Sequence, residues 1–331
     1  MILVRTPFRL PLGGGGTDLP SYYSKFGGFL ITAAINKYMY INVNVPAIVN
    51  KIKINYSKTE ILNLGEIDKI KHDIVRESLK YLEINQPIEI SSMADISAGT
   101  GMGSSSSYTV GLLRALNTLK KRYISTQELA EEACKIEIEK IGKPIGKQDQ
   151  YAAAFGGIIT LEIDTSGSVI VKPLKIHQET IKELESSLMM FYTNIERDAN
   201  EILSEQSNKM KVEHNDAVNS VHIIKEIGKE IKNSLENDDI YTFGKLMNEH
   251  WNVKKKISQK MSNDKIDFWY ELALKNGAIG GKIMGAGGGG FLLFCVELGK
   301  RKVLRNALEN VGLRYMDFRF DWEGCKVLVN I

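Results

Sequence analysis

Hydrophobic and polar residues follow different patterns in the two halves of the chain. In the first half, runs rich in β-branched and aromatic residues lie between turn residues at 38–49 and 87–93, which is typical of strands. From about 177 to 275 the sequence has no proline and only two glycines, and apolar residues recur among polar ones, which predicts several helices. Apolar runs at 291–298 and 325–331 predict two further strands.

This change of pattern predicts two domains that meet near residues 165–180. The 331 residues are enough for about two domains of ordinary size, and all seven prolines lie in the first 173 residues. Each half combines strand patterns with helix patterns. We therefore expect an α+β architecture, with one domain over residues 1–170 and a second over residues 171–331.

Composition narrows the class of protein without indicating an activity. Hydrophobic residues make up 43% of the chain and charged residues 25%, as in globular proteins. The net charge of +3, without a basic run that contains aromatics, argues against a nucleic-acid-binding surface. No stretch approaches the ~20 consecutive apolar residues of a membrane span, the N-terminus lacks a secretory pattern, and the three cysteines show no paired spacing. We therefore expect a cytoplasmic protein that binds neither nucleic acid nor membrane.

Glycines are concentrated at 13–16, 99–103 and 285–290. Any one of these runs could be a flexible loop. The middle run differs because four serines at 104–107 follow it, and apolar residues then recur at helical spacing, which predicts a serine-capped helix. Such a helix start offers free N–H groups to phosphate oxygens, and a serine hydroxyl there can bind magnesium. The spacing is not that of a P-loop.

A carboxylate at an apolar helical position is a second signal. Ser125 and Glu128 have the spacing of a capping box, which predicts the start of a helix. At ~100° per residue, Glu137 shares one helix face with apolar residues. Those residues are Ala130, Ala133, Cys134 and Ile141. A buried carboxylate is costly unless it is paired or binds a cation, so Glu137 is a residue at the rim of the apolar face, part of a local salt bridge, or a ligand of Mg²⁺.

Asp149 follows a turn that ends this helix. Gly142, Pro144 and Gly146 prevent the helix from continuing, and Asp149 precedes the next apolar segment. Two roles fit an aspartate here, a helix N-cap or a general base. The histidines offer no competing base, because they lie in polar or helical stretches where surface or packing roles are expected. They are His72, His177, His214, His222 and His250.

Three motifs, taken in order, resemble those of the GHMP kinases, the family that includes galactokinases, homoserine kinases and mevalonate kinases. They are RTPFRLPLGGGGTDLP at 5–20, SAGTGMGSSSS at 97–107 and GGKIMGAGGGGF at 280–291. The interval from Glu137 to Asp149 is also similar to the spacing between magnesium ligand and base in galactokinases. The resemblance implies an N-terminal domain like domain 2 of ribosomal protein S5 and a ferredoxin-like C-terminal domain, with the active site between them.

The resemblance further implies an ATP-dependent phosphotransferase that uses Mg²⁺, and it assigns roles to the matching residues. Asp149 would accept the proton of the attacking hydroxyl, and Arg9 would make that hydroxyl more acidic and steady charge on the transferred group. Glu137 and one serine, taken as Ser105, would hold the metal. The ATP phosphates would lie against Gly99, Thr100, Gly101, Met102, Gly103, Ser104, Ser105 and Ser106.

The first motif indicates a sugar substrate, because Asp18 aligns with the hydroxyl-binding aspartate of galactokinases. The GGGTD sequence followed by LPSYY, and the segment 191–206, are similar to D-glycero-D-manno-heptose 7-phosphate kinases. That likeness implies phosphorylation of the anomeric hydroxyl to the 1,7-bisphosphate, on the way to GDP-heptose for surface polysaccharide. The expected substrate residues are Gly15, Gly16, Thr17, Asp18, Thr193, Arg197, Gly287 and Gly288.

Departures from the family pattern leave part of this open. The first motif has a fourth glycine, and Pro11 and Leu12 precede its glycine run, so the identity of the sugar and its phosphate stay open. Arg197 suits a substrate phosphate because its guanidinium binds oxygens with two nitrogens, but it could equally pair with Glu201 on a surface helix.

Other activities are compatible with the same motifs. The chain could be a kinase for another sugar or a mevalonate-type alcohol, although Asp18 in a sugar-type motif counts against the alcohol. It could also be an inactive sugar and ATP sensor, but both expected carboxylates, Glu137 and Asp149, are present. The expected partner is a small-molecule sugar phosphate, and a homodimer is left open.

Overall fold

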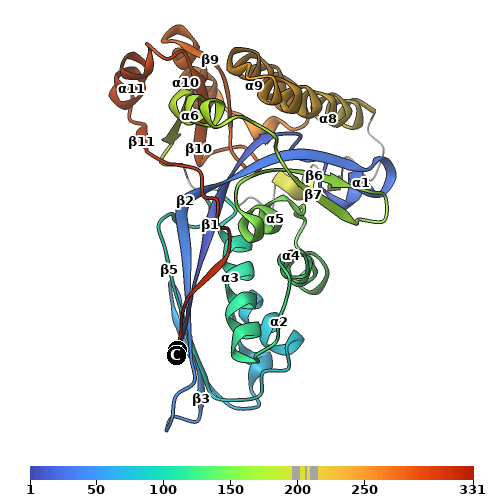
Figure 1. Cartoon of the computed structure of the whole chain (residues 1–331), viewed down its shortest axis with the longest axis vertical. Helices are drawn as coiled ribbons and strands as arrows, with labels where there is room; N and C mark the ends of the chain where they lie inside the picture. Colours follow the sequence, from blue (N-terminus) through green and yellow to red (C-terminus); the bar gives the residue numbers. More distant parts are fainter. Residues whose placement is uncertain (196–201, 206, 209–214) are drawn as a thin grey trace.

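The chain forms two β-sheets, each covered by helices. A computed structural model describes residues 1–195, 202–205, 207–208 and 215–331. In Figure 1 the first sheet extends from the bottom of the molecule to above its middle, and the second sheet lies at the top with most of the later helices. This arrangement confirms the expected two-domain fold of mixed helices and sheets.

Eight described strands make up the first sheet, in the order β12-β1-β2-β5-β3-β4, with β6 paired to β2 and β7 paired to β6. They are β1 (Ile2–Gly13), β2 (Gly28–Asn44), β3 (Lys51–Asn55), β4 (Thr59–Asn63), β5 (Ile88–Ala94), β6 (Ile158–Ile163), β7 (Val169–Pro173) and β12 (Lys326–Asn330). The helices of this half are α1 (Pro20–Phe26), α2 (Asp73–Tyr81), α3 (Ser104–Leu119), α4 (Thr126–Cys134) and α5 (Gln148–Phe155). Short helical turns lie at η1 (Ile67–Lys69) and at η2 (Lys135–Lys140), a π-helix that continues α4.

Burial along β1 shows how this sheet is covered. Its side chains alternate between buried and partly exposed up to Arg5 and are then buried without interruption to Gly13. Helix α3 packs on β1 and β2, and α8 (Asn215–Glu236) from the other half packs on the same two strands. A strand that is covered on both faces loses the alternating pattern, so the end of β1 lies inside the molecule. The first glycine motif follows directly from this buried end.

The second sheet has the order β11-β8-β10-β9 among the described residues. Its strands are β8 (Leu188–Tyr192), β9 (Ala278–Ile283), β10 (Phe291–Val296) and β11 (Arg314–Met316). The remaining described helices are α6 (Gln178–Ser187), α9 (Ile240–Lys254), α10 (Asp264–Lys275), α11 (Arg301–Asn310) and the short turn η3 (Gln259–Met261). Helix α9 packs on β9 and beside α8, and the buried core includes Phe191, Trp251 and Phe294.

The chain crosses between the sheets twice. The chain leaves the first sheet after β7, which ends at Pro173, and enters the second sheet with β8, which begins at Leu188. At its end the chain returns, because β12 pairs antiparallel with β1. The first sheet is therefore completed by residues from both ends of the sequence.

Most expected strands are present, with changed bounds. The expected strands at 87–93, 291–298 and 325–331 correspond to β5, β10 and β12. The run at 38–49 is only the second part of β2, which begins at Gly28 and ends at Asn44. Pro46, which has no N–H to donate to a neighbouring strand, follows this end. The expected all-helical interval also contains β8, a strand too short to alter a pattern read over a long window.

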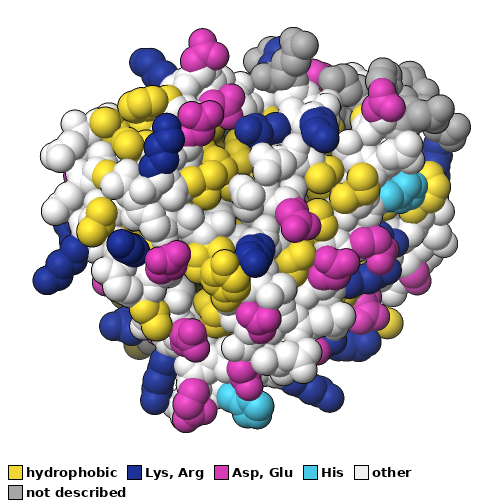
Figure 2. Space-filling model, turned by 90° about the horizontal axis from the view of Figure 1, so that it is seen from above, with side chains coloured by type: hydrophobic (Ala, Val, Ile, Leu, Met, Phe, Trp, Pro, Cys, Tyr) yellow, Lys and Arg dark blue, Asp and Glu magenta, His cyan; other side chains and the backbone are white. Residues whose placement is uncertain are grey.

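Charged side chains of both signs are intermingled on the face in Figure 2, as expected for a net charge of only +3. Apolar side chains on this face form small patches between them. None of the helices in the described part of the chain is long and apolar enough to cross a membrane.

Candidate active site

Arg9 and Asp149 form a two-pronged ion pair where β1 meets α5. Arg9 Nε donates to Asp149 Oδ1 at 2.6 Å, and Arg9 Nη2 donates to Oδ2 at 2.8 Å. The remaining nitrogen, Nη1, donates to the carbonyl oxygen of Gly101 at 2.7 Å. Asp149 is not the N-cap of α5, because Lys147 occupies that position. The structure thus brings together the expected base and the expected basic residue.

Glu137 is fully buried in the π-helix that follows α4, as its helical face predicted. Ser105 Oγ donates to Glu137 Oε1 at 2.5 Å, and Gln150 Nε2 donates to Oε2 at 2.8 Å. Lys143 Nζ lies 2.7 Å from Ser105 Oγ and 3.2 Å from Glu137 Oε1. A π-helix turn of this kind is frequent at functional sites, and here it carries the carboxylate to the start of α3.

Ser105 and Glu137 fit a magnesium site by the chemistry of their donors. Both offer oxygen atoms, and the ammonium of Lys143 already contacts an oxygen of each, so the local environment favours a cation. The described residues contain no group of three or more acidic, histidine or cysteine side chains that could hold a metal. Mg²⁺ often takes one or two protein ligands and completes its shell with phosphate oxygens and water, so this small set suffices.

The loop between β5 and α3 is shaped by alternate glycines. Gly99, Gly101 and Gly103 have φ near +79°, +78° and +79°, a left-handed conformation that side chains disfavour. A Cβ at Gly103 would also lie 2.9 Å from a carboxylate oxygen of Asp149. Gly103 is itself the N-cap of α3 and no serine side chain caps the helix, so the expected serine cap is wrong.

This loop lines a groove of about 740 Å³. Its glycines Gly99, Gly101 and Gly103 and the hydroxyl-bearing Ser104, Ser105 and Ser106 face the groove. The two remaining residues do not line it. Met102 is buried, and Thr100 is buried with its hydroxyl donating to the carbonyl of Ser97 at 2.9 Å. Thr100 and Met102 anchor the loop in the protein interior, and the glycines between and beside them line the groove.

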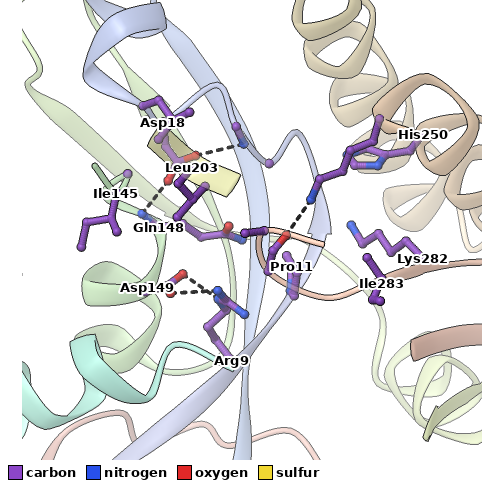
Figure 3. A pocket seen from close by; sticks show the side chains of 17 residues that line it. Arg9, Pro11, Asp18, Ile145, Gln148, Asp149, Leu203, His250, Lys282 and Ile283 are labelled. Carbon is purple, nitrogen blue, oxygen red and sulfur yellow. Dashed lines mark hydrogen bonds and ion pairs between the residues drawn. The ribbon is translucent and has the colours of Figure 1, made fainter. Parts of the chain in front are cut away.

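Asp18 lies in a smaller cavity of about 90 Å³ on the other side of the Arg9–Asp149 pair. Its two carboxylate oxygens accept from the backbone N–H of Gly16 at 3.1 Å and of Gln148 at 3.0 Å. Burial raises the pKa of this carboxyl. In Figure 3, Asp18 and Asp149 are on the left of the cavity, and His250 and Lys282 are on the right.

The other expected substrate residues differ in their placement. Gly15 and Gly16 line the small cavity. Thr17 is buried, and its hydroxyl donates to the carbonyl oxygens of Gly14 and Phe29, both at 2.8 Å, so it stabilises the turn. Thr193 is likewise buried, and its hydroxyl donates to the carbonyl of Gly290 at 2.8 Å.

The glycine motif near the C-terminus has one part that lines the two cavities and another that packs against η3. Gly285 and Ala286 line both the cavity and the groove. Gly287 and Gly288 instead lie against Met261, where a Cβ at Gly287 would meet the backbone and the N–H of Gly288 donates to the Met261 carbonyl at 2.9 Å. Arg197 lies outside the described residues.

Several residues of the site were not expected from the sequence. Lys143 and Gln150 surround Glu137, and His250 and Lys282 line the small cavity. The sequence does contain a signal for Lys282, a charged residue between apolar neighbours in a predicted glycine-rich segment. Of the surface or packing roles expected for the histidines, burial of His250 excludes a surface role, and His250 also lines the cavity.

Comparison with known proteins shows that the chain belongs to the GHMP kinase family. Residues 69–157 match the model described as GHMP kinases N terminal domain, and residues 231–312 match GHMP kinases C terminal. The chain is 34% identical to D-glycero-alpha-D-manno-heptose 7-phosphate kinase of Campylobacter jejuni, with 98% of each chain covered. It is 27% identical to a galactokinase of Pyrococcus furiosus, over 97% of this chain and 95% of that one.

A solved structure shows the same architecture. The crystal structure of a D-glycero-D-manno-heptose 1-phosphate kinase from Bacteroides thetaiotaomicron superposes with a TM-score of 0.83 at 28% sequence identity, and 100% of both chains is covered. The similarity therefore spans both sheets and the cavities between them.

The environment of His250 makes the stability of the protein depend on pH. Burial, and then the nearby Lys282 and Lys254, lower the pKa of His250 well below its ordinary value. The unfolded chain therefore binds this proton more readily than the folded chain, so stability falls as pH drops below about 6.5, the pKa of an unfolded histidine. We expect His250→Leu to remove up to about 2 kcal/mol of the stability lost between pH 7 and pH 5.

Urea unfolding of the parent and of His250→Leu at both pH values measures this difference. Other groups titrate in the same range and contribute equally to both proteins. The quantity compared is therefore the loss of unfolding free energy from pH 7 to pH 5 in each protein. Equal losses of unfolding free energy in the two proteins would contradict the assignment.

Proposed function

Because this chain belongs to the GHMP kinase family and is an ATP-dependent sugar kinase, we propose that its substrate is D-glycero-D-manno-heptose 7-phosphate. The reaction would transfer the γ-phosphoryl group of ATP to the anomeric C1 hydroxyl and yield the 1,7-bisphosphate. The protein would act in the cytoplasm, and its product would be used to make GDP-heptose for surface polysaccharide. The support for the sugar is the 34% identity to a heptose 7-phosphate kinase over nearly the whole of both chains.

The position of the Arg9–Asp149 pair is the observation that carries the proposed chemistry. Both residues line the small cavity and both line the large groove, so the pair stands where the two spaces meet. Phosphoryl transfer requires an acceptor and a donor on either side of the transferred group, nearly in line. We assign the sugar to the small cavity and the ATP phosphates to the glycine loop in the groove.

Asp149 is the proton acceptor in this assignment. As the oxygen of C1 bonds to the γ-phosphorus, the bond from that phosphorus to the departing ADP oxygen breaks, and the hydroxyl proton moves to the Asp149 carboxylate. Arg9 holds this carboxylate by two hydrogen bonds and is held in turn by Gly101. Its positive charge also lies where negative charge develops on the transferred group.

The other roles follow from the contacts already described. Ser105 and Glu137 would hold Mg²⁺, which when bound would neutralise charge on the ATP phosphates. Gln150 fixes the Glu137 carboxylate from the side opposite Ser105. Asp18 accepts two backbone N–H groups, which hold its carboxylate in one orientation to receive a hydrogen bond from a sugar hydroxyl.

The substrate assignment is tested by ADP release from a panel of acceptors. We expect turnover to be fastest with D-glycero-D-manno-heptose 7-phosphate, compared with unphosphorylated heptose, galactose, fucose and mevalonate. Phosphorus NMR of the product should show the new phosphate on C1. Preferred turnover of another acceptor, or a new phosphate at a different position, would exclude this substrate. No turnover of any acceptor would favour a sensor of sugar and ATP.

Asp149→Asn tests the proposed base. The substitution keeps the size of the side chain and removes its ability to accept a proton, so we expect kcat to fall by about 10²–10⁴-fold. ATP binding, measured by calorimetry, should change little. The exposed Asp317→Asn, which lies outside both cavities, is the control and should retain parent activity. Parent-like turnover by Asp149→Asn would rule out the proposed role.

Glu137→Gln tests the magnesium assignment. Loss of one charged oxygen should weaken metal binding, so we expect at least a tenfold rise in the Mg²⁺ concentration that gives half-maximal rate, in line with about 1.5–3 kcal/mol for a bond to a charged group. Glu139→Gln, on the exposed side of the same helical turn, is the matched control. An unchanged Mg²⁺ titration for Glu137→Gln would contradict the assignment.

A further inference from the structure

The side of the small cavity opposite the two aspartates is basic and buried. His250 and Lys254 come from α9, and Lys282 comes from β9. Their exposed fractions are 1%, 9% and 2%. All three line the small cavity, and none lines the large groove. Figure 3 shows His250 and Lys282 together on the right of the cavity, away from Asp18 and Asp149.

The ring nitrogens of His250 form no hydrogen bond with the described residues. Both nitrogens are buried. A buried polar group without a partner costs free energy, and such groups in folded proteins usually have a function or a ligand. An imidazole that faces a cavity with both nitrogens unused is therefore available to a bound molecule.

Lys282 is held in place by a backbone carbonyl oxygen. Its Nζ donates to the carbonyl oxygen of Leu12 at 3.0 Å, which engages one of the three N–H donors of an ammonium. Lys254 Nζ similarly donates to the carbonyl of Gly285 at 2.7 Å. Burial, and then the charges of Lys254 and Arg9, lower the pKa of Lys282 well below its ordinary value.

The acidic residues of the cavity are already engaged elsewhere. Asp149 is paired with Arg9, and Asp18 accepts two backbone N–H groups. The ion pairs among the described residues do not include Lys282. Among the described residues, the cavity therefore has acceptors on one side and donors on the other. An anion bound on the basic side would place a negative charge next to the Lys282 ammonium.

We propose that His250, Lys282 and Lys254 bind the phosphate that the sugar already carries, remote from the hydroxyl that is phosphorylated. This inference rests on the proposed function, since it assigns the 7-phosphate of the substrate to the basic side of the cavity. The γ-phosphate of ATP is assigned to the groove, which these residues do not line. A sugar bound in this way directs its phosphate toward α9 and β9 and its anomeric carbon toward Arg9 and Asp149.

The experiment compares two acceptors that differ only in this phosphate. His250→Leu removes both ring nitrogens without breaking a hydrogen bond of the described protein, and Lys282→Met removes a charge from a side chain of similar shape. We expect each to lower kcat/KM for heptose 7-phosphate by about 10–100-fold, mainly through KM, as for loss of a hydrogen bond to a charged group. For unphosphorylated heptose, kcat/KM should change much less in both variants. The exposed Lys256→Met is the control.

A second measurement separates this inference from the proposed function. Inorganic phosphate, titrated without ATP, should raise the melting temperature of the parent more than that of His250→Leu or Lys282→Met. If the parent does not phosphorylate heptose 7-phosphate but shows this differential shift, the proposed function fails and the anion site stands. If the parent phosphorylates it, and the variants lose equal activity on both sugars with an unchanged phosphate shift, the anion site is overturned.

Discussion

The ion pair between Arg9 and Asp149 is the contact on which the site depends. It joins β1 to α5, and the bond from Arg9 to the Gly101 carbonyl adds the glycine loop before α3. A largely buried pair of charges is favourable only when its geometry is good and its hydrogen bonds are satisfied, and the two-pronged contact meets this condition. Gly103 completes the arrangement by leaving room for the carboxylate. Strand, loop and helix must therefore be placed together before either cavity exists.

The second sheet completes the site because it approaches the first at positions without side chains. A Cβ at Gly290 would overlap the carbonyl of Thr100, so the C-terminal glycine motif can lie directly on the glycine loop before α3. Lys282 reaches in the opposite direction, from β9 to the carbonyl of Leu12 at the buried end of β1. These contacts explain why the glycine runs, which are far apart in the sequence, are found around one site.

The sequence predicted those parts of the site that depend on local patterns. Helical periodicity alone placed Glu137 on a buried face, and resemblance to a family assigned Asp149 and Arg9 to one site, where they form an ion pair. The serine cap was wrong because Gly103, in a left-handed conformation, begins α3 instead. His250 could not be recognised from its neighbours in α9. Its burial and its unused nitrogens depend on how α9 packs on β9, which no local pattern encodes.

The division of the small cavity into an acidic and a basic side has a consequence for selectivity. Under the proposed assignments, a substrate with hydroxyls at one end and a phosphate at the other would satisfy both sides in one orientation only, and that orientation would bring its anomeric oxygen to Asp149. A sugar without the phosphate would leave the buried His250 nitrogens without a hydrogen-bond partner among the described residues. Rejection then arises from groups left unsatisfied and not from steric exclusion, a means of discrimination that is stronger than the loss of an apolar contact. His250 would thus contribute to the selection of the substrate.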